Sequence, residues 1–441
     1  MKRRIYNIKS IITWDPNKND LVEIKNSEIL VSDGQILEIS NNIDKTNNDI
    51  DANNSLITPS FIDSHTHPIF VGNRSKELRM RAMGKSYQEI ANEGGGIISS
   101  ILGVRESNFN ALYNSTKMNI ENIIINGTTL LEAKSGYGLT FKDEIKSLSV
   151  IQSLNQKLPI DIVATFLGAH AFPPEYKNNK DDYVKLICDE MIPEVAENKM
   201  AEFCDVFCEK GYFDIKQSKK ILDTAKQFGL TPRLHADEFI DSGAAELASE
   251  INAISADHLM AVSDKGIKAL SESNVIATLL PGTTLFLGKK EYANGRKLID
   301  AGIDVAIATD FNPGSCTINS IPIIISLAVL YCGLTVQEAF KGVTWNAAKS
   351  LNRHTSHGLI SNGYKADFIF WDINSIDEIP YWFGRDKINK IFKDGIEIYS
   401  GNKIWFVNIT ISKTLIVKSL FISPQLQLDV SLLLIIQLLI I

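Results

Sequence analysis

Strand-like and helix-like segments alternate through the middle of the chain, from residue 58 to residue 357. Alternating strands and helices predict a parallel sheet covered by helices, and eight such units are typical of a closed (β/α)8 barrel. A doubly wound open sheet is the alternative, but no G-x-G-x-x-G motif follows the first strand. The apolar runs that we expect to form the eight strands are 61–67, 129–133, 162–170, 205–209, 233–237, 255–258, 275–280 and 304–310.

The two ends of the chain share a second pattern, in which short apolar runs are separated by turns that contain glycine. Near the start, "EILVSDGQILEIS" places Ser32-Asp33-Gly34 between two alternating runs, which predicts a hairpin. Near the other end, "GLISNGYKADFIFWD" (358–372) and "IFKDGIEIYSG" (391–401) repeat the pattern. We therefore expect an α/β fold with two domains. Residues 1–57 together with 358–408 form a small β-sandwich domain, and residues 58–357 form the (β/α)8 TIM-like barrel.

Composition limits the partners and the compartment. The net charge of −7 argues against a nucleic-acid-binding protein. Five cysteines are an odd number in a long chain, which disfavours a disulfide framework and predicts a reducing, cytoplasmic location. Residues 409–441 form an apolar tail. Its last twelve residues, "VSLLLIIQLLII" (430–441), are fewer than the roughly 20 of a membrane span, so a membrane is not the expected partner. A packed helix, a partner-binding segment and a sequence artefact remain open for this tail.

Histidines gather at the predicted carboxyl ends of the strands, the face that holds the active site in a (β/α)8 barrel. Two residues i and i+2 on a strand point to one face about 6.6 Å apart, so an H-x-H pair there can bind one metal ion. H-x-H alone is a weak signal, but its combination with the other strand-end residues predicts a metal site. The residues at these ends are His65, His67, His170, His235, His258 and Asp310. The other two histidines, His354 and His357, are expected in solvent.

Four segments carry a resemblance to a known family: "FIDSHTH" (61–67), "RLHADE" (233–238), "SADHL" (255–259) and "IATDFNPGS" (307–315). With them, the chain resembles the amidohydrolase superfamily of metal-dependent hydrolases. "HTHPIFVGNRSKE" (65–77), "EAKSGYGL" (132–139) and "FLGAHA" (166–171) are similar to the members that open the ring of 4-imidazolone-5-propanoate. The resemblance covers about residues 1–408 and does not extend to the tail.

The resemblance implies a single metal ion, one Zn²⁺ or Fe³⁺ per chain, held by His65, His67, His235 and Asp310. Superfamily members with two metals commonly bridge them with a modified lysine on the fourth strand, and that segment here reads "DVFCEK". We therefore expect no bridge, and Glu209 stays open as an extra ligand. The metal-activated water attacks the ring carbonyl, and the candidate proton shuttles are Glu238, His258 and Asp310.

The resemblance also implies a set of substrate contacts. Arg74 grips the propionate carboxylate, because a guanidinium can form two parallel hydrogen bonds with it. The other expected contacts are Tyr137, His170, Glu238, Asn312, Gly314 and Ser315. The implied reaction is hydrolysis of the ring amide C–N bond to N-formimidoyl-L-glutamate.

Two alternatives remain at this stage. Another amidohydrolase, such as a guanine- or cytosine-type deaminase, would share the metal ligands but would not need Arg74, because its base carries no carboxylate. A non-catalytic scaffold would lose ligands, whereas all four are present in this sequence. The only partner that we expect is the small-molecule substrate, and a homodimer is left open.

Overall fold

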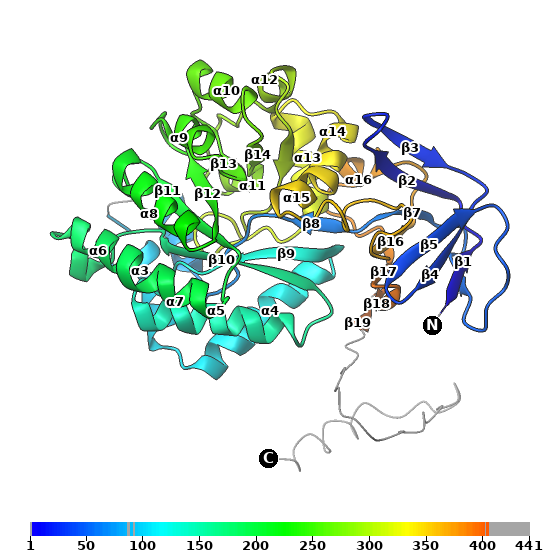
Figure 1. Cartoon of the computed structure of the whole chain (residues 1–441), viewed down its shortest axis with the longest axis horizontal. Helices are drawn as coiled ribbons and strands as arrows, with labels where there is room; N and C mark the ends of the chain where they lie inside the picture. Colours follow the sequence, from blue (N-terminus) through cyan, green and yellow to red (C-terminus); the bar gives the residue numbers. More distant parts are fainter. Residues whose placement is uncertain (1, 86–88, 91–92, 402, 405–441) are drawn as a thin grey trace, which may run out of the picture. The chain divides into compact units, whose positions relative to one another are not determined.

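The computed structural model describes residues 2–85, 89–90, 93–401 and 403–404. Eight parallel strands form one sheet, in which each strand pairs with its neighbours in chain order, and the helices lie around it (Figure 1). The strands are β8 (Phe61–Asp63), β9 (Thr128–Lys134), β10 (Asp161–Ala169), β11 (Phe203–Cys208), β12 (Thr231–Ala236), β13 (Ser255–His258), β14 (Ile276–Leu279) and β15 (Val305–Ile307). The predicted (β/α)8 barrel is therefore confirmed.

The sheet closes just beyond the carboxyl ends of its first and last strands. Thr66 forms a parallel bridge with Phe311, and the Asp310 N–H donates to the carbonyl of His65 at 3.0 Å. The His67 N–H donates to the carbonyl of Phe311 at 2.8 Å. The predicted strands 61–67 and 304–310 were thus too long, because their last residues leave the regular ladder. The closing bonds nevertheless bring the H-x-H pair beside Asp310.

The barrel helices follow from local sequence signals. For example, Asp214 and Gln217 form a capping box at the start of α8, and the apolar side of that helix packs on β11. The helices are α1 (Ser75–Ala82), α3 (Ile97–Glu106), α4 (Phe109–Ile124), α5 (Phe141–Asn155), α6 (Lys180–Leu186), α7 (Ile192–Glu197), α8 (Ile215–Gln227), α9 (Ala244–Glu250), α10 (Asp264–Ser271), α11 (Pro281–Phe286), α12 (Gly295–Asp300), α13 (Ile321–Tyr331), α14 (Val336–Gly342), α15 (Trp345–Ser350) and α16 (Glu378–Tyr381).

Two further sheets are built from the ends of the chain, and the second of them combines strands from both ends. One has the order β5-β4-β1-β6 and the other the order β19-β18-β17-β16-β7-β2-β3. The blue strands and the orange strands of Figure 1 lie side by side because β16 pairs with β7. The strands are β1 (Arg3–Tyr6), β2 (Ser10–Asp15), β3 (Asp20–Ile24), β4 (Glu28–Ser32), β5 (Gln35–Ser40), β6 (Ile50–Asp51), β7 (Leu56–Pro59), β16 (Phe368–Trp371), β17 (Ile388–Lys393), β18 (Ile396–Ser400) and β19 (Lys403–Ile404).

These sheets share one apolar core, which includes Ile29 of the first sheet and Phe368 of the second. The predicted hairpin is confirmed: Ser32 pairs with Gln35 across a two-residue turn. Both turn residues have positive φ, 54° at Asp33 and 82° at Gly34, as a type I′ turn requires. The sandwich from both termini is thus confirmed, whereas the domain limits 1–57 with 358–408 and 58–357 stay a prediction. The tail, 409–441, lies outside the described residues.

Three smaller expectations have different outcomes. All five cysteines are free and buried, as expected without a disulfide framework. Among the described helices, none combines the length and the apolar character needed to cross a bilayer. The expectation for His357 was wrong. Its side chain is buried, and both ring nitrogens have partners: Nε2 lies 2.9 Å from Asp161 Oδ2 and Nδ1 lies 2.8 Å from Ser356 Oγ.

Candidate active site

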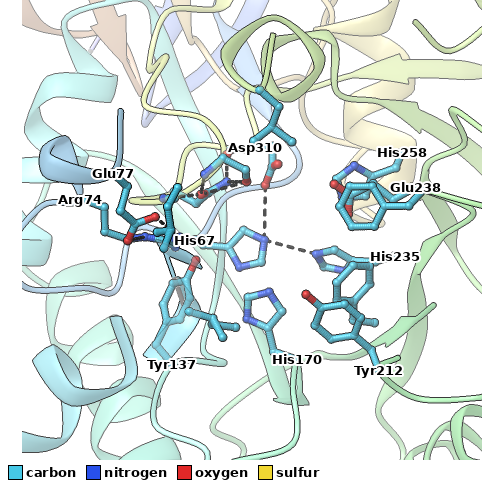
Figure 2. Close-up of a pocket in the computed structure, with 18 of the residues that line it drawn as sticks. His67, Arg74, Glu77, Tyr137, His170, Tyr212, His235, Glu238, His258 and Asp310 are labelled. Carbon is cyan, nitrogen blue, oxygen red and sulfur yellow. Dashed lines mark hydrogen bonds and ion pairs between the residues drawn. The ribbon is translucent and has the colours of Figure 1, made fainter. Parts of the chain in front are cut away.

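A cavity of about 530 Å³ opens at the carboxyl ends of the barrel strands and gathers the predicted site residues. Figure 2 shows His67 near its middle, with Arg74 and Glu77 on one side and Glu238 and His258 on the other. Eleven of the predicted residues line it: His67, Arg74, Tyr137, His170, His235, Glu238, His258, Asp310, Asn312, Gly314 and Ser315. His65 does not line the cavity, but it is buried directly against His67.

Four of the separations among the predicted metal ligands are short. His67 Nε2 lies 3.3 Å from Nε2 of His65 and 3.3 Å from Nε2 of His235. Asp310 Oδ1 lies 3.6 Å from His65 Nε2 and 3.5 Å from His67 Nε2. A tetrahedral ion with ligands at about 2.0–2.2 Å holds them about 3.3–3.6 Å apart. These four separations match those of ligands around one ion, and His65, His67 and Asp310 form one group whose ligand atoms all lie within 4.8 Å of one another, whereas no such group among the described residues contains both His235 and Asp310.

The outer nitrogens of two of these histidines fix their tautomers. His65 Nδ1 lies 2.7 Å from Asp257 Oδ2, and His235 Nδ1 lies 3.1 Å from Asp205 Oδ1. An ionised carboxylate only accepts hydrogen bonds, so each Nδ1 carries the proton and each Nε2 turns a lone pair inward. Lone pairs that face one another and Asp310 repel unless a cation lies between them. The donor set thus fits a metal ion.

Burial favours the neutral form of four imidazoles of the site. It holds the pKa of His65, His67 and His258 well below the ordinary histidine value. It also lowers the pKa of His170 to about 3. Neutral rings have the lone pairs that a metal ion needs. His170 stacks on His67 with ring centroids 5.0 Å apart, and its Nδ1–H donates to the Gly136 carbonyl at 3.0 Å.

Two carboxylic acids of the site are shifted toward protonation. Burial raises the pKa of Asp310 to about 6, and the Thr283 hydroxyl donates to its Oδ2 at 2.5 Å. Burial also raises the pKa of Glu238 well above its ordinary value, and the charge of Asp310 adds to this effect. Glu238 Oε2 lies 3.6 Å from His258 Nε2. Glu238 and His258, two of the three proton-transfer candidates, thus lie together in the cavity wall.

Arg74 has a partner that the sequence analysis did not consider. Its Nε donates to Glu77 Oε1 at 2.7 Å, and its Nη2 donates to Glu77 Oε2 at 2.8 Å. Both residues line the cavity. The i, i+3 spacing at the start of α1 was the available signal, because residues at that spacing are neighbours on a helix.

Other parts of the site serve to hold its loops. Asn312 Oδ1 accepts from the N–H groups of Gly314 and Ser315 at 2.8 and 2.7 Å, which fixes the turn after Asp310. Glu209 accepts from the Phe239 N–H at 2.9 Å and is absent from the metal-ligating groups found among the described residues.

The cavity residues that sequence analysis missed, besides Glu77, are Arg81, Lys85, Ile90, Ile97, Phe207, Tyr212, Phe239, Leu287 and Lys289.

A closed barrel with clustered histidines and an aspartate at the carboxyl ends of its strands is typical of metal-dependent hydrolases. A family model for the amidohydrolase family matches residues 216–398. The imidazolonepropionase of Geobacillus kaustophilus is 45% identical over 349 residues, which cover 79% of this chain and 82% of that protein. The imidazolonepropionase of Clostridium tetani is 45% identical over 346 residues, or 78% of this chain and 82% of that protein. The chain belongs to the imidazolonepropionase family.

Solved structures share the fold at low sequence identity. An adenosine deaminase from Xanthomonas campestris with bound zinc has a TM-score of 0.70 at 14% identity, covering 92% of this chain and 94% of that one. A guanine deaminase from C. acetobutylicum with bound guanine has a TM-score of 0.70 at 17% identity, covering 90% of this chain and 100% of that one. At these identities the likeness establishes the architecture alone.

Proposed function

We propose that this protein hydrolyses the ring amide C–N bond of 4-imidazolone-5-propanoate and releases N-formimidoyl-L-glutamate. One observation carries the proposal: a guanidinium and a cluster of metal-ligating side chains line the same cavity. The substrate has the matching parts, a cyclic amide and a propionate side chain. Membership of the imidazolonepropionase family supports the same reaction.

The cofactor in this proposal is one Zn²⁺ or Fe³⁺ ion, held by His65, His67, His235 and Asp310. Their converging lone pairs and their separations support this ligand set. When bound, such an ion lowers the pKa of a water to about 7 and polarises a carbonyl oxygen. Glu209 is left out, because its carboxylate already accepts backbone N–H groups.

Glu238 and His258 move the protons, and Asp310 shares this work. Attack of water on the ring carbonyl carbon releases a proton, and the ring nitrogen gains one as its bond to that carbon breaks. The former carbonyl becomes a carboxylate, and the nitrogen stays in the formimidoyl group. Glu238 lines the cavity beside His258, which supports a transfer from the oxygen to the nitrogen by this pair.

Arg74 holds the propionate carboxylate through charge-assisted hydrogen bonds, which orients the ring toward the ligand cluster. Tyr137 is a second contact, and its side chain is buried where the charges of both Arg74 and Asp310 act on it. The remaining proposed contacts are His170, Glu238, Asn312, Gly314 and Ser315.

The test is turnover by purified, metal-loaded protein, followed as the loss of imidazolone absorbance. Guanine, cytosine and adenosine serve as comparison substrates, and ammonia release is measured in the same samples. We expect rapid loss of the imidazolone and no deamination of the bases. Deamination of a base with no reaction of the imidazolone would instead favour the deaminase alternative, whose substrate needs no carboxylate clamp.

A first prediction concerns Thr283, whose hydroxyl donates a hydrogen bond to Oδ2 of Asp310. Thr283→Val keeps the side-chain shape but removes this hydrogen bond, so Asp310 loses its fixed orientation. Loss of an outer partner of a metal ligand lowers metal affinity by about 10- to 100-fold. Competition with a chelator measures the affinity, and Thr283→Ser is the control that should bind nearly as well as the wild type. Equal affinity in the valine variant would exclude this role.

A further inference from the structure

Glu77 joins three parts of the cavity wall. It lies in the first turn of α1 and is only 7% exposed. Its two carboxylate oxygens accept from Nε and Nη2 of Arg74, at 2.7 and 2.8 Å. Oε1 also accepts from the Gly96 N–H at 2.9 Å, so Glu77 ties Arg74 to the segment that leads into α3. A buried carboxylate with three such donors has a fixed position.

The other side of the Arg74 guanidinium lies against backbone. A Cβ atom built on Gly314 would stand 2.0 Å from Arg74 Nη1 and 2.7 Å from Cζ. Contacts this short are impossible, so only glycine leaves room for the guanidinium at this point. Glu77 and Gly314 together confine the Arg74 guanidinium. Asn312 in turn holds the Gly314 backbone, through a hydrogen bond of 2.8 Å.

We infer that Glu77 is a positioning residue that sets Arg74 for the carboxylate of the substrate. An arginine side chain loses rotamer freedom when it grips a ligand, and this cost is removed if the guanidinium is already fixed. The inference rests on the proposed role of Arg74 as the carboxylate clamp. In the opposite role, Glu77 would compete with the substrate for Arg74, and removal of its charge would lower KM.

Glu77→Gln tests the inference, because it keeps the side-chain shape and removes the charge. We expect KM for 4-imidazolone-5-propanoate to rise about tenfold, the effect of weakening one charge-assisted hydrogen bond, with kcat within about threefold of wild type. KM for an analogue with a propionamide in place of the propionate should not change. Glu202→Gln is the control. It removes a different Arg–Glu ion pair, between Arg353 and the residue just before β11, and should leave KM and kcat unchanged.

The double variant Arg74→Ala/Glu77→Gln distinguishes positioning from a structural role. If Glu77 acts through Arg74, the double variant has the same KM as Arg74→Ala alone. Additive effects, an unchanged KM or a lower KM in Glu77→Gln would overturn the inference. If Arg74→Ala itself leaves KM unchanged, the carboxylate clamp of the proposed function fails instead.

A second variant covers the case in which Glu77→Gln does not fold. Gly314→Ala pushes on the guanidinium from the opposite side, and we expect it to raise KM for the charged substrate and not for the propionamide analogue. An unchanged KM for the charged substrate in a folded Gly314→Ala protein would overturn the inference, because Arg74 would then not need its fixed position.

Discussion

His67→Ala should abolish turnover and leave the barrel folded. We expect turnover to fall by more than about 100-fold. Removal of a residue that only hydrogen-bonds to a metal ligand already lowers metal affinity or activity by about 10- to 100-fold. This substitution is cleaner than His65→Ala, because His67 Nδ1 has no hydrogen-bond partner among the described residues, whereas His65 is bonded to Asp257. The measurements are steady-state turnover, metal content and thermal unfolding of the metal-free protein.

The control for this prediction is His354→Ala. His354 does not line the cavity. Its ring packs edge-on against Trp345, with ring centroids 5.7 Å apart. The His354→Ala protein should keep both its metal ion and its turnover. Full activity of His67→Ala with one tightly bound ion would contradict the ligand set, and two tightly bound ions in the wild type would contradict a mononuclear site.

Arg74→Ala should lower kcat/KM by about 10- to 100-fold, because a hydrogen bond to a charged group contributes about 1.5–3 kcal/mol. Arg74→Lys should fall in between, since it keeps the charge and loses the planar fork. Binding energy remote from the breaking bond also orients the ring, so kcat is expected to fall together with the rise in KM.

The propionamide analogue is the control for Arg74. Wild type should discriminate strongly against it, and Arg74→Ala should discriminate little. This comparison separates the lost clamp from a general disturbance caused by leaving Glu77 without its ion pair. If wild-type protein hydrolyses the charged and uncharged compounds equally well, Arg74 does not bind a carboxylate.

Much of the fold was predictable because buried parallel strands have a simple signature. Every residue of β9 and β11 is buried, and both strands carry apolar residues that only Glu132, Lys134, Asp205 and two threonines interrupt. The ends of β8 and β15 were not predictable in the same way. Residues 65–67 and 310–311 pair with one another across the closure of the barrel, and this long-range contact has no local signal.

The site was predictable where strand ends carry its residues, and less so elsewhere. The structure brings the proposed substrate contacts and the predicted ligands other than His65 to one cavity and buries His65 beside it, whereas their roles stay predictions. Thr283 was missed because it reaches Asp310 from the start of α11, far away in the sequence. Asp205 and Asp257 were missed because nothing in a strand sequence tells which inward carboxylate orients a histidine. His357 was misjudged because its partner Asp161 lies on a distant strand.

The most direct test of the central claim is the identity of the product formed in ¹⁸O-labelled water. Metal-loaded protein acting on 4-imidazolone-5-propanoate should yield N-formimidoyl-L-glutamate with one ¹⁸O atom in the carboxylate derived from the ring carbonyl, and no ammonia. Mass spectrometry locates the label by fragmentation of the product. Release of ammonia with the ring intact, or no reaction by protein that carries its metal ion, would contradict the proposed function.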